Sequence, residues 1–562
     1  MDKQEYYERN LLALARFAPL CSKITGAQTT LGKYKFLDSP SGEIIPAYVD
    51  QSGSARPLHS LMDPRREAGR LMQAGGEGFI VLLGLGGGFC AEAALEQKNT
   101  AIVLVIDYDA DSIAELLCHR DYVKIFMDPR FYLLVDPPKA VIEQFIPEIY
   151  KPMLHGGIRI LPLRARTAGS LNFSGAREAA ENALNKVSAD YSVQSYFGMR
   201  WFSNIIRNLK KAGGTNSILP PIKRAAVTAA GPSLSYQLKI IADQRSGIYL
   251  IATDTSLPCL LSQNIRPDAV VSIDCQHIGY YHFMSGIPPE TILFMDLAAP
   301  ALTASCTDNV RFFTGNHPLA AYASLLWRPL PEVDTSGGNV TYSAIDLAEK
   351  LGAVTIELYG ADFSYPSGLT YATGTYIHQL FYNKQKRLAP LEAQHSAFLY
   401  RGLLVKKTQA VGWYYESPSL KFYRERLEEK STAMDAELRP IPGLGPLLTV
   451  PDSPKARQKY FLQKLMLHKP INVFGSGKCL QSADDFLNSY KNDINKLPAI
   501  QNAGCLQSFY GRDKQILTTL LPVMAGIKRR NPDIEITGLA ERTKQYCVTE
   551  IEKVLDSGLY ND

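Results

Sequence analysis

Glycines, small hydroxyl residues and aspartates follow one apolar run after another in the middle of the chain. A glycine ahead of a helix lets main-chain N–H groups approach a phosphate, whose charge the helix dipole favours. An aspartate can accept hydrogen bonds from ribose hydroxyls or base amino groups. The residue types and their spacing therefore predict a nucleotide site built from Gly231, Pro232, Ser233, Asp254, Thr255, Asp274, Gln276, Thr335, Ser336, Gly337, Gly338, Asn339 and Asp362.

Each of these residues also has a purely structural interpretation. Ser, Thr, Asp and Asn are common helix N-caps, and glycines are common in turns. At a single strand end, the structural interpretation is stronger than the ligand-binding one. Polar residues at about six strand ends together favour a ligand-binding site. The sequence has no GxxxxGK[ST] motif, which excludes a P-loop NTPase, and it has no HExxH or GxSxG motif.

The elements that must position these residues are short apolar strands separated by helical segments. The sequence predicts strands over 225–228, 247–252, 269–273, 291–294, 310–313 and 354–359, and a helix over 340–351. Strands that alternate with helices form a parallel, doubly wound sheet. Ligands of such sheets bind outside the carboxyl ends of the strands, where the polar residues above are expected.

A second α/β series precedes this one. The apolar run 79–83 is followed by the glycine-rich turn Gly84–Gly88, a helix over 89–96 and a strand that ends at Asp107. Further strands are expected in RFYLLVD and GIRILPL. The acid lies 21 residues past Gly86, a spacing that suits the ribose of a dinucleotide or of S-adenosylmethionine. Phe89 takes the place of the third fingerprint glycine, so a purely structural Rossmann-like domain is an equal alternative.

The predicted fold is α/β, with two Rossmann-like parallel-sheet domains and a mainly helical C-terminal domain. We expect an N-terminal domain with a helical linker over residues 1–215, a nucleotide-binding domain over 216–430 and helices over 431–562. Amphipathic helices are predicted over 455–470 and 513–530, and a long helical region over 176–212.

Composition narrows the class of protein. Lys and Arg number 60 against 55 Asp and Glu, and the basic residues are scattered, so no nucleic-acid partner is expected. The nine cysteines form no CxxC pair and no zinc spacing, which indicates reduced thiols and a cytoplasmic location. No apolar run approaches 18 residues and the first residues do not read as a signal peptide, so no membrane span is expected.

Four stretches together resemble the motility-accessory-factor (Maf) flagellin glycosyltransferases. They are LHSLMDPRREAGRLM (58–72), VTAAGPSLS (227–235), NIRPDAVVSID (264–274) and DTSGGNVTYSAIDLAEKLGAVTIELYGADFSY (334–365). The central domain of that family is similar to bacterial sialyltransferases and to 6-hydroxymethylpterin diphosphokinase of the MptE type. The resemblance implies a CMP-activated nonulosonic acid, pseudaminic- or legionaminic-like, as donor and Ser or Thr hydroxyls of flagellin or another protein as acceptor.

The resemblance also implies an inverting displacement that requires no cofactor, although Mg²⁺ is compatible with it. Gly231, Pro232, Ser233, Asp254 and Asp274 would face the nucleotide, and Ser336, Gly337 and Gly338 would hold the phosphate or ribose. A general base must take the acceptor proton, which favours histidine. The family tends to place a histidine shortly after Gly-x-Asp-Leu, where this chain has Tyr371. His378 is therefore our predicted base, and the predicted donors to the leaving group are Tyr365, Tyr371 and Tyr376.

Two other functions fit the same residues, and the displaced histidine leaves open a transferase that has lost its activity. A pterin diphosphokinase would use ATP and Mg²⁺, with Asp254, Asp274 and Asp362 gathered around the metal. A non-catalytic, motility-associated binding protein would keep the fold only to recognise a partner. The N- and C-terminal extensions speak against the kinase, because a small-molecule kinase needs no surface for protein docking.

Overall fold

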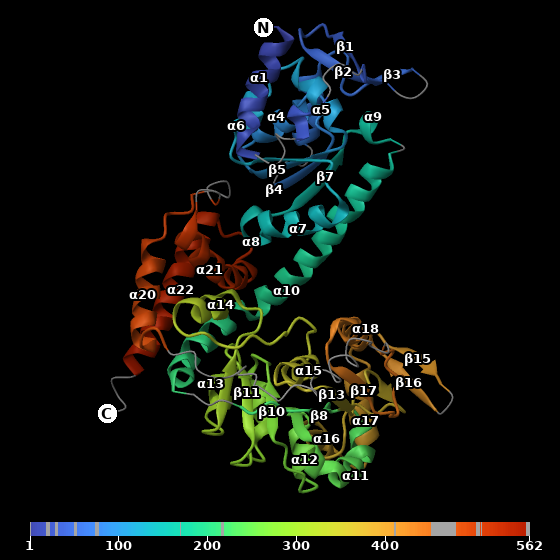
Figure 1. The fold of residues 1–562 in the computed structure, drawn as a ribbon, viewed down its shortest axis with the longest axis vertical. Coiled ribbons are helices and arrows are strands. Elements are labelled where there is room, and N and C mark those ends of the chain that lie inside the picture. Colours follow the sequence, from blue (N-terminus) through green and yellow to red (C-terminus); the bar gives the residue numbers. More distant parts are fainter. Residues whose placement is uncertain are drawn as a thin grey trace, which may run out of the picture. The chain divides into compact units, whose positions relative to one another are not determined.

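In the computed structural model the chain forms two α/β units (Figure 1). The structure describes residues 2–17, 23–27, 32–49, 53–73, 78–168, 170–214, 219–409, 412–450, 479–501, 506 and 509–557. Unit 1 comprises residues 1–198 and 497–545, and unit 2 comprises 199–496 and 546–562. The predicted domain boundaries at 215 and 430 stay predictions. The division between units falls instead inside the long helix α10 (Leu171–Gly213) and inside α22 (Ile536–Asp556).

Unit 1 is organised around a four-stranded parallel sheet with strand order β6-β5-β4-β7. Its two central strands are buried at every residue, which is typical of a sheet covered on both faces. The sheet confirms the predicted βαβ unit, and both strands expected after it are present. Its strands are β4 (Gly78–Leu83), β5 (Thr100–Asp107), β6 (Phe131–Val135) and β7 (Ile158–Pro162).

Short elements surround this sheet. A three-stranded antiparallel sheet consists of β1 (Tyr34–Asp38), β2 (Ile44–Val49) and β3 (Ala55–Pro57). The helices of the unit that precede α10 are α1 (Lys3–Ala13), η1 (Leu14–Phe17), α3 (Pro64–Gln73), α4 (Phe89–Leu95), α5 (Ala110–Leu117), α6 (Val123–Met127), α7 (Lys139–Ile149), α8 (Pro152–His155) and α9 (Arg164–Thr167). Helix α21 (Gly511–Arg530) confirms the helix predicted over 513–530.

Unit 2 contains a seven-stranded parallel sheet with strand order β12-β11-β10-β9-β8-β13-β17. The six predicted strands appear within two residues of their expected bounds. The seventh, an edge strand that pairs with β13 over Thr355–Leu358, was not predicted. The strands are β8 (Arg224–Thr228), β9 (Tyr249–Thr253), β10 (Ala269–Ser272), β11 (Ile292–Asp296), β12 (Val310–Phe313), β13 (Thr355–Tyr359) and β17 (Glu437–Pro440).

Helices cover this sheet and carry its crossovers. Apolar side chains of α15 and α18 pack in one core with the strands, among them Ile345 and Leu427. The helices are α11 (Leu234–Gln244), η2 (Arg245–Gly247), α12 (Leu257–Leu261), η3 (His277–Phe283), α13 (Ala301–Ala304), α14 (Pro318–Leu326), α15 (Val340–Lys350), α16 (Tyr376–Lys384), α17 (Leu391–Leu399), α18 (Pro418–Ala433) and α20 (Ala483–Lys496). A small antiparallel sheet has the order β14 (Tyr365–Pro366), β16 (Trp413–Glu416), β15 (Val405–Thr408).

The C-terminal helices are divided between the two units. Residues 497–545 belong to unit 1, whereas α20 and the end of α22 belong to unit 2. In unit 2, Phe202 of α10 lies 6.3 Å from Tyr546 of α22, measured between ring centroids. The predicted helix over 455–470 lies outside the described residues. In the described part of the chain no helix is both long and apolar enough to cross a membrane.

Candidate functional site

The predicted site residues of unit 2 lie along one edge of its sheet. All seven strands run in parallel, so their carboxyl ends share that edge. The chain adds β9 to β12 successively on one side of β8 and then returns to place β13 on the other side. The order therefore reverses at β8, the point where ligands of doubly wound sheets bind.

At this reversal point Asp362 joins the two loops that flank it. Its carboxylate accepts hydrogen bonds from the Ser233 N–H (2.9 Å), from the Ser233 hydroxyl and from the Gly445 N–H (3.0 Å). The Gly231 N–H donates to the carbonyl of Gly360 (2.9 Å). A Cβ on Gly231 would lie 2.4 Å from the Asp362 carboxylate, so only glycine fits there. The polar groups of these two loops are therefore hydrogen-bonded to each other.

The segment that follows β17 covers this turn. The Leu444 N–H donates to the hydroxyl of Ser233 (2.6 Å), and Gln237 donates to the carbonyl of Pro442 (3.0 Å). The cavity left among Ser233, Asp362 and this segment measures 20 Å³, about the room of one water molecule. Ser233 and Asp362 thus lie at the predicted place in the fold, but they hold the covering segment, and the cavity beside them is too small for a phosphate. Pro232 is buried next to them, and Gly231 is partly exposed.

The next two strand ends carry the predicted acids. Asp254 is buried and accepts hydrogen bonds from the N–H (2.7 Å) and hydroxyl (3.0 Å) of Thr255 and from the hydroxyl of Ser272 (2.9 Å). Asp274 is only half-buried and accepts one bond from the Gln276 N–H (2.9 Å). Burial raises the pKa of Asp274, and the nearby charge of Asp254 adds to this shift. Thr255, Asp274 and Gln276 are the partly exposed members of this group.

The Ser-Gly-Gly turn forms the start of helix α15. Asn339 caps the helix by accepting from the Tyr342 N–H (3.0 Å), and Gly338 has a φ of +72°. Within the described residues, no oxygen accepts a hydrogen bond from the main-chain N–H of Val340 or Thr341. Ser336 and Gly338 are exposed beside them. Thr335 to Asn339 therefore present the free end of an 11-residue helix, where an anion is favoured.

Charged side chains that the sequence analysis missed stabilise this turn. The ammonium of Lys430, on α18, lies 2.7 Å from an oxygen of Asp346 and 3.3 Å from an oxygen of Asp334. Partial burial by itself would raise the pKa of Asp334. Hydrogen bonds from Ser336 and Tyr342 and the charge of Lys430 outweigh burial and lower that pKa to about 2. Lys430 lies 96 residues after Asp334, and no motif in the sequence connects the two.

Two of the three predicted tyrosines, Tyr365 and Tyr371, lie on the segment between β13 and α16. This segment crosses the end of β8, because the Ala372 N–H donates to the Ala230 carbonyl (3.0 Å) and the Thr373 N–H to the Ser235 hydroxyl (2.9 Å). Burial raises the pKa of Tyr365, and it raises the pKa of Tyr371 to about 12. Both phenols are therefore protonated at neutral pH and can act as hydrogen-bond donors.

Tyr376 begins helix α16 and contacts the segment after β10. Its ring stacks on Tyr281 at 5.2 Å with an interplanar angle of 8°, and it meets the edge of His282 at 5.9 Å. His282 is buried, and its Nδ1 has no hydrogen-bond partner among the described residues. The sequence analysis missed His282; the only available signal was its position shortly after a strand end.

His378 lies in the first turn of α16, next to a second histidine. Its main-chain N–H donates to the Thr375 hydroxyl (3.3 Å), and its ring centroid lies 6.2 Å from that of His395. Burial lowers the pKa of His378, so the imidazole is neutral at neutral pH and able to accept a proton. His395 is buried and hydrogen-bonded to Thr370 (2.8 Å).

Helix α10 supports the rim of the same edge through its C-terminal turns. The side-chain amide of Asn204 donates to the carbonyl of Ala298 (2.8 Å), and that of Asn208 donates to the carbonyls of Leu297 (2.9 Å) and Ala299 (2.8 Å). Both asparagines are buried. Residues predicted only as a helical linker thus position the loop after β11.

The glycine-rich turn of unit 1 is buried, and most of its polar groups are hydrogen-bonded to described residues of its own unit. The carboxylate of the buried Asp107 accepts from the N–H groups of Leu85 (2.7 Å) and Tyr108 (2.8 Å). The Gly87 N–H donates to Nε2 of His59 (2.9 Å), and the Gly84 N–H donates to the carbonyl of Ile106 (2.8 Å). This geometry favours the structural alternative for Gly84–Gly88 and Asp107.

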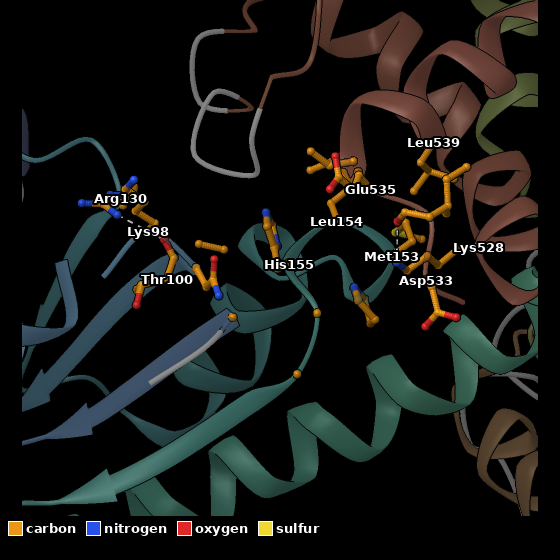
Figure 2. Close-up of a pocket in the computed structure, with 18 of the residues that line it drawn as sticks. Lys98, Thr100, Arg130, Met153, Leu154, His155, Lys528, Asp533, Glu535 and Leu539 are labelled. Carbon is orange, nitrogen blue, oxygen red and sulfur yellow. Dashed lines mark hydrogen bonds between the residues drawn. The ribbon is translucent and has the colours of Figure 1, made fainter. Parts of the chain in front are cut away.

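Figure 2 shows the residues around a separate cavity of 1220 Å³ in unit 1. Arg130 donates to the Leu95 carbonyl (2.5 Å), and Lys528 donates to the Ile534 carbonyl (2.8 Å). Burial lowers the pKa of His155 to about 4, and its Nδ1 accepts from the Lys151 N–H (2.9 Å). The cavity lies at the amino ends of β4 and β5, away from the carboxyl ends where such sheets bind ligands, and it is not part of the candidate site.

The three acids named for a magnesium site do not form one cluster in the structure. Each is hydrogen-bonded within its own loop or to a neighbouring loop, as described above. Among the described residues, no group of three or more His, Cys, Asp or Glu side chains could hold a metal ion.

The sequence of this chain is similar to a family model and to proteins of known sequence. Residues 200–368 match the family model described as 6-hydroxymethylpterin diphosphokinase MptE-like. An uncharacterized protein of Treponema pallidum (strain Nichols) is 33% identical over 152 residues, which cover 26% of this chain and 54% of the relative. A second uncharacterized protein of that organism is 30% identical over 164 residues, which cover 28% of this chain and 78% of the relative. The chain thus spans about half the length of the first of these relatives.

The fold also has a solved counterpart. The structure of a Maf glycosyltransferase from Magnetospirillum magneticum AMB-1 superposes with a TM-score of 0.58, over 99% of this chain and 95% of that one, at 13% sequence identity. This likeness confirms the predicted fold class. With the MptE-like match, it supports the resemblance that the four sequence motifs indicated. The chain therefore belongs to the family of the Treponema pallidum protein that it matches over 78% of that protein's length, and its central part is an MptE-like domain.

Proposed function

We propose that this protein is a glycosyltransferase that moves a nonulosonic acid, pseudaminic- or legionaminic-like, from a CMP-activated donor to Ser or Thr hydroxyls of flagellin or another protein in the cytoplasm. The observation that carries the proposal is the free N-terminus of α15, which lies at the carboxyl edge of a sheet whose fold matches that of a Maf glycosyltransferase. A CMP-sugar supplies the phosphate that such a helix end favours.

In this proposal the N–H groups of Val340 and Thr341 hold the phosphate, together with the hydroxyl of Ser336. Asp274, Thr255 and Gln276 are the partly exposed polar groups available to the nucleoside. During transfer the sugar carbon loses its bond to the phosphate oxygen and gains one to the acceptor oxygen. Negative charge therefore gathers on the phosphate, and fixed donors stabilise it more strongly in the transition state than in the ground state.

The acceptor hydroxyl must lose its proton in the same step. His378 is our proposed base, because burial lowers its pKa and keeps it neutral at neutral pH. His282 is a second candidate, because it is buried beside Tyr376 with an unpartnered Nδ1 in the described part of unit 2. Tyr365, Tyr371 and Tyr376 remain the proposed donors to the leaving group.

Calorimetric titration with CMP, followed by mass spectrometry of flagellin incubated with a CMP-nonulosonic acid, tests this function. We expect CMP to bind and the acceptor to gain the mass of one sugar. Absence of CMP binding by the folded protein would overturn the proposal. The family description MptE-like favours one alternative, a pterin diphosphokinase, which would release AMP from ATP in the presence of 6-hydroxymethylpterin and Mg²⁺. Parallel assays of the two reactions separate them.

A further inference from the structure

Unit 1 has its own cavity at the place where a doubly wound sheet binds ligands. The cavity measures 900 Å³, and Gly84 and Leu85 after β4 and Leu163 after β7 contribute to its lining. The chain adds β5 and β6 on one side of β4 and returns to place β7 on the other, so the strand order reverses between β4 and β7. This is the position in unit 1 that corresponds to the reversal point at β8 in unit 2.

The glycine-rich turn is buried and offers few anion contacts to this cavity. Its N–H groups at Gly84, Leu85 and Gly87 already donate within the chain, and Asp107 is buried. Burial lowers the pKa of His59 to about 3, so the ring that closes the turn is uncharged. A ligand in this cavity must be held by the other wall, helix α3.

Helix α3 presents two arginines to the cavity. Arg66 and Arg70 are four residues apart, which places them on one face of the helix, and both line the cavity and are exposed. Neither side chain forms an ion pair with any residue that the structure describes. The adjacent Arg65 does, with Glu43 (2.5 Å) and Glu92 (3.1 Å). Two like charges one turn apart repel each other, and a bound anion would relieve that repulsion.

The two acids on the cavity wall are engaged at the start of the same helix. Asp63 accepts from the main-chain N–H of Arg66 (2.9 Å), and Glu67 accepts from the Ser60 N–H (2.7 Å). The guanidinium groups of Arg66 and Arg70 are the positively charged groups of this wall, and no described residue forms an ion pair or side-chain hydrogen bond with them.

The rest of the wall is largely apolar. Leu58, Leu85 and Leu163 contribute to it, and Met62 and Leu71 line it while remaining 68% and 38% exposed. Large apolar side chains left exposed at the rim of a cavity are typical of a binding site.

We propose that unit 1 binds an organic anion, a phosphate monoester or a carboxylate with an apolar or aromatic body, in the cavity between α3 and the ends of β4 and β7. Arg66 and Arg70 hold the anion through forked hydrogen bonds, and the leucine wall holds the body. Because the acid and the N–H groups that would recognise ribose and pyrophosphate are engaged, the ligand is not a dinucleotide. The site is separate from the proposed transferase site in unit 2.

Calorimetric titration of the full chain with phenyl phosphate, phenylacetate, inorganic phosphate and benzyl alcohol tests the proposal. We expect one of the two aromatic anions to bind at least tenfold more tightly than inorganic phosphate and benzyl alcohol, and the stronger of the two identifies the anion class. The double variant Arg66→Ala/Arg70→Ala should weaken this binding at least tenfold. Leu71→Ser should lower the affinity for the aromatic anion and leave the affinity for inorganic phosphate unchanged.

The matched control is Arg65→Ala, a neighbour on the same helix whose charge is already paired. It should leave the affinity within twofold, and Arg66→Lys/Arg70→Lys should recover part of the loss because charge returns without the fork. The melting temperature of each variant checks that unit 1 remains folded. The proposal is overturned if no probe binds, if inorganic phosphate binds as tightly as the aromatic anions, or if the double alanine variant binds like the unaltered chain.

Discussion

Ser233 and Asp362 are 129 residues apart in the sequence, yet the N–H of Ser233 donates to the carboxylate of Asp362 at 2.9 Å. The bond joins the turn after β8 to the turn after β13, and the Gly445 N–H completes the junction. The residues that most resemble a phosphate-binding turn thus act as a structural joint. In the proposed function, the ligand-facing role passes to the turn that begins α15.

The first prediction concerns this joint. Asp362→Ala leaves the buried N–H groups of Ser233 and Gly445 without their acceptor, which should lower the free energy of unfolding of unit 2 by about 3 kcal/mol. Urea denaturation followed by tryptophan fluorescence measures the change, and Asp243→Ala on α11 serves as a surface control. A variant that loses CMP binding at unchanged stability would show that Asp362 contacts the ligand instead.

The second prediction isolates one hydrogen-bond donor at the start of α15. Val340→Pro removes the N–H of the first helical residue but suits its position, because proline is common there and Asn339 already has an extended backbone. We expect CMP affinity to fall by about 10- to 100-fold, the loss of one hydrogen bond to a charged group. Val340→Ala, which keeps the N–H, is the control. Equal affinities for the two variants would place the phosphate elsewhere.

The third prediction concerns the ion pair of Lys430 with Asp346. Lys430→Met leaves the buried Asp346 with Lys350 (3.0 Å) as its remaining cation among the described residues. The free energy of unfolding should therefore fall by about 2 kcal/mol, less than for a buried carboxylate left with no cation. Lys421→Met on the same helix removes only an exposed pair with Glu425 at 3.7 Å and should have little effect. If both variants unfold at the same urea concentration, the ion pair does not anchor α18 to α15.

The fourth prediction concerns pH. The pKa of Asp334 is lowered to about 2, below its ordinary value of 3.8, so the charged carboxylate stabilises the folded state. This stabilisation is fully present above pH 3.8 and should be lost as the pH falls toward 2. Asp334→Asn should remove that part of the acid dependence when unfolding is measured between pH 5 and pH 2. An unchanged acid profile would contradict the assignment.

The fifth prediction tests the general base. His378→Gln should lower kcat by about 100- to 10,000-fold while CMP still binds. Because burial lowers the pKa of His378, the rate of the unaltered enzyme should fall only below the ordinary histidine pKa of 6.5. The kcat of His282→Gln is measured for comparison with that of His378→Gln. A loss of kcat in that variant alone would transfer the role to His282.

The amino-acid sequence by itself determined every strand of the two parallel sheets except β17, and helices such as those over 89–96 and 340–351, because apolar runs and their spacing reflect local backbone preference and burial. It also indicated which strand ends carry polar groups. Four motifs in it indicated the resemblance to the Maf family. These properties depend on neighbours along the chain.

The tertiary structure alone decided which of those polar groups remain free. Ser233 is covered because residues 442–445 return from beyond β17, and Gly84–Gly88 is closed because His59 lies against it. Lys430 reaches Asp334 from a helix 96 residues later. Whether a polar group faces a ligand or its own chain depends on these long-range approaches, which leave no periodic signal in the sequence.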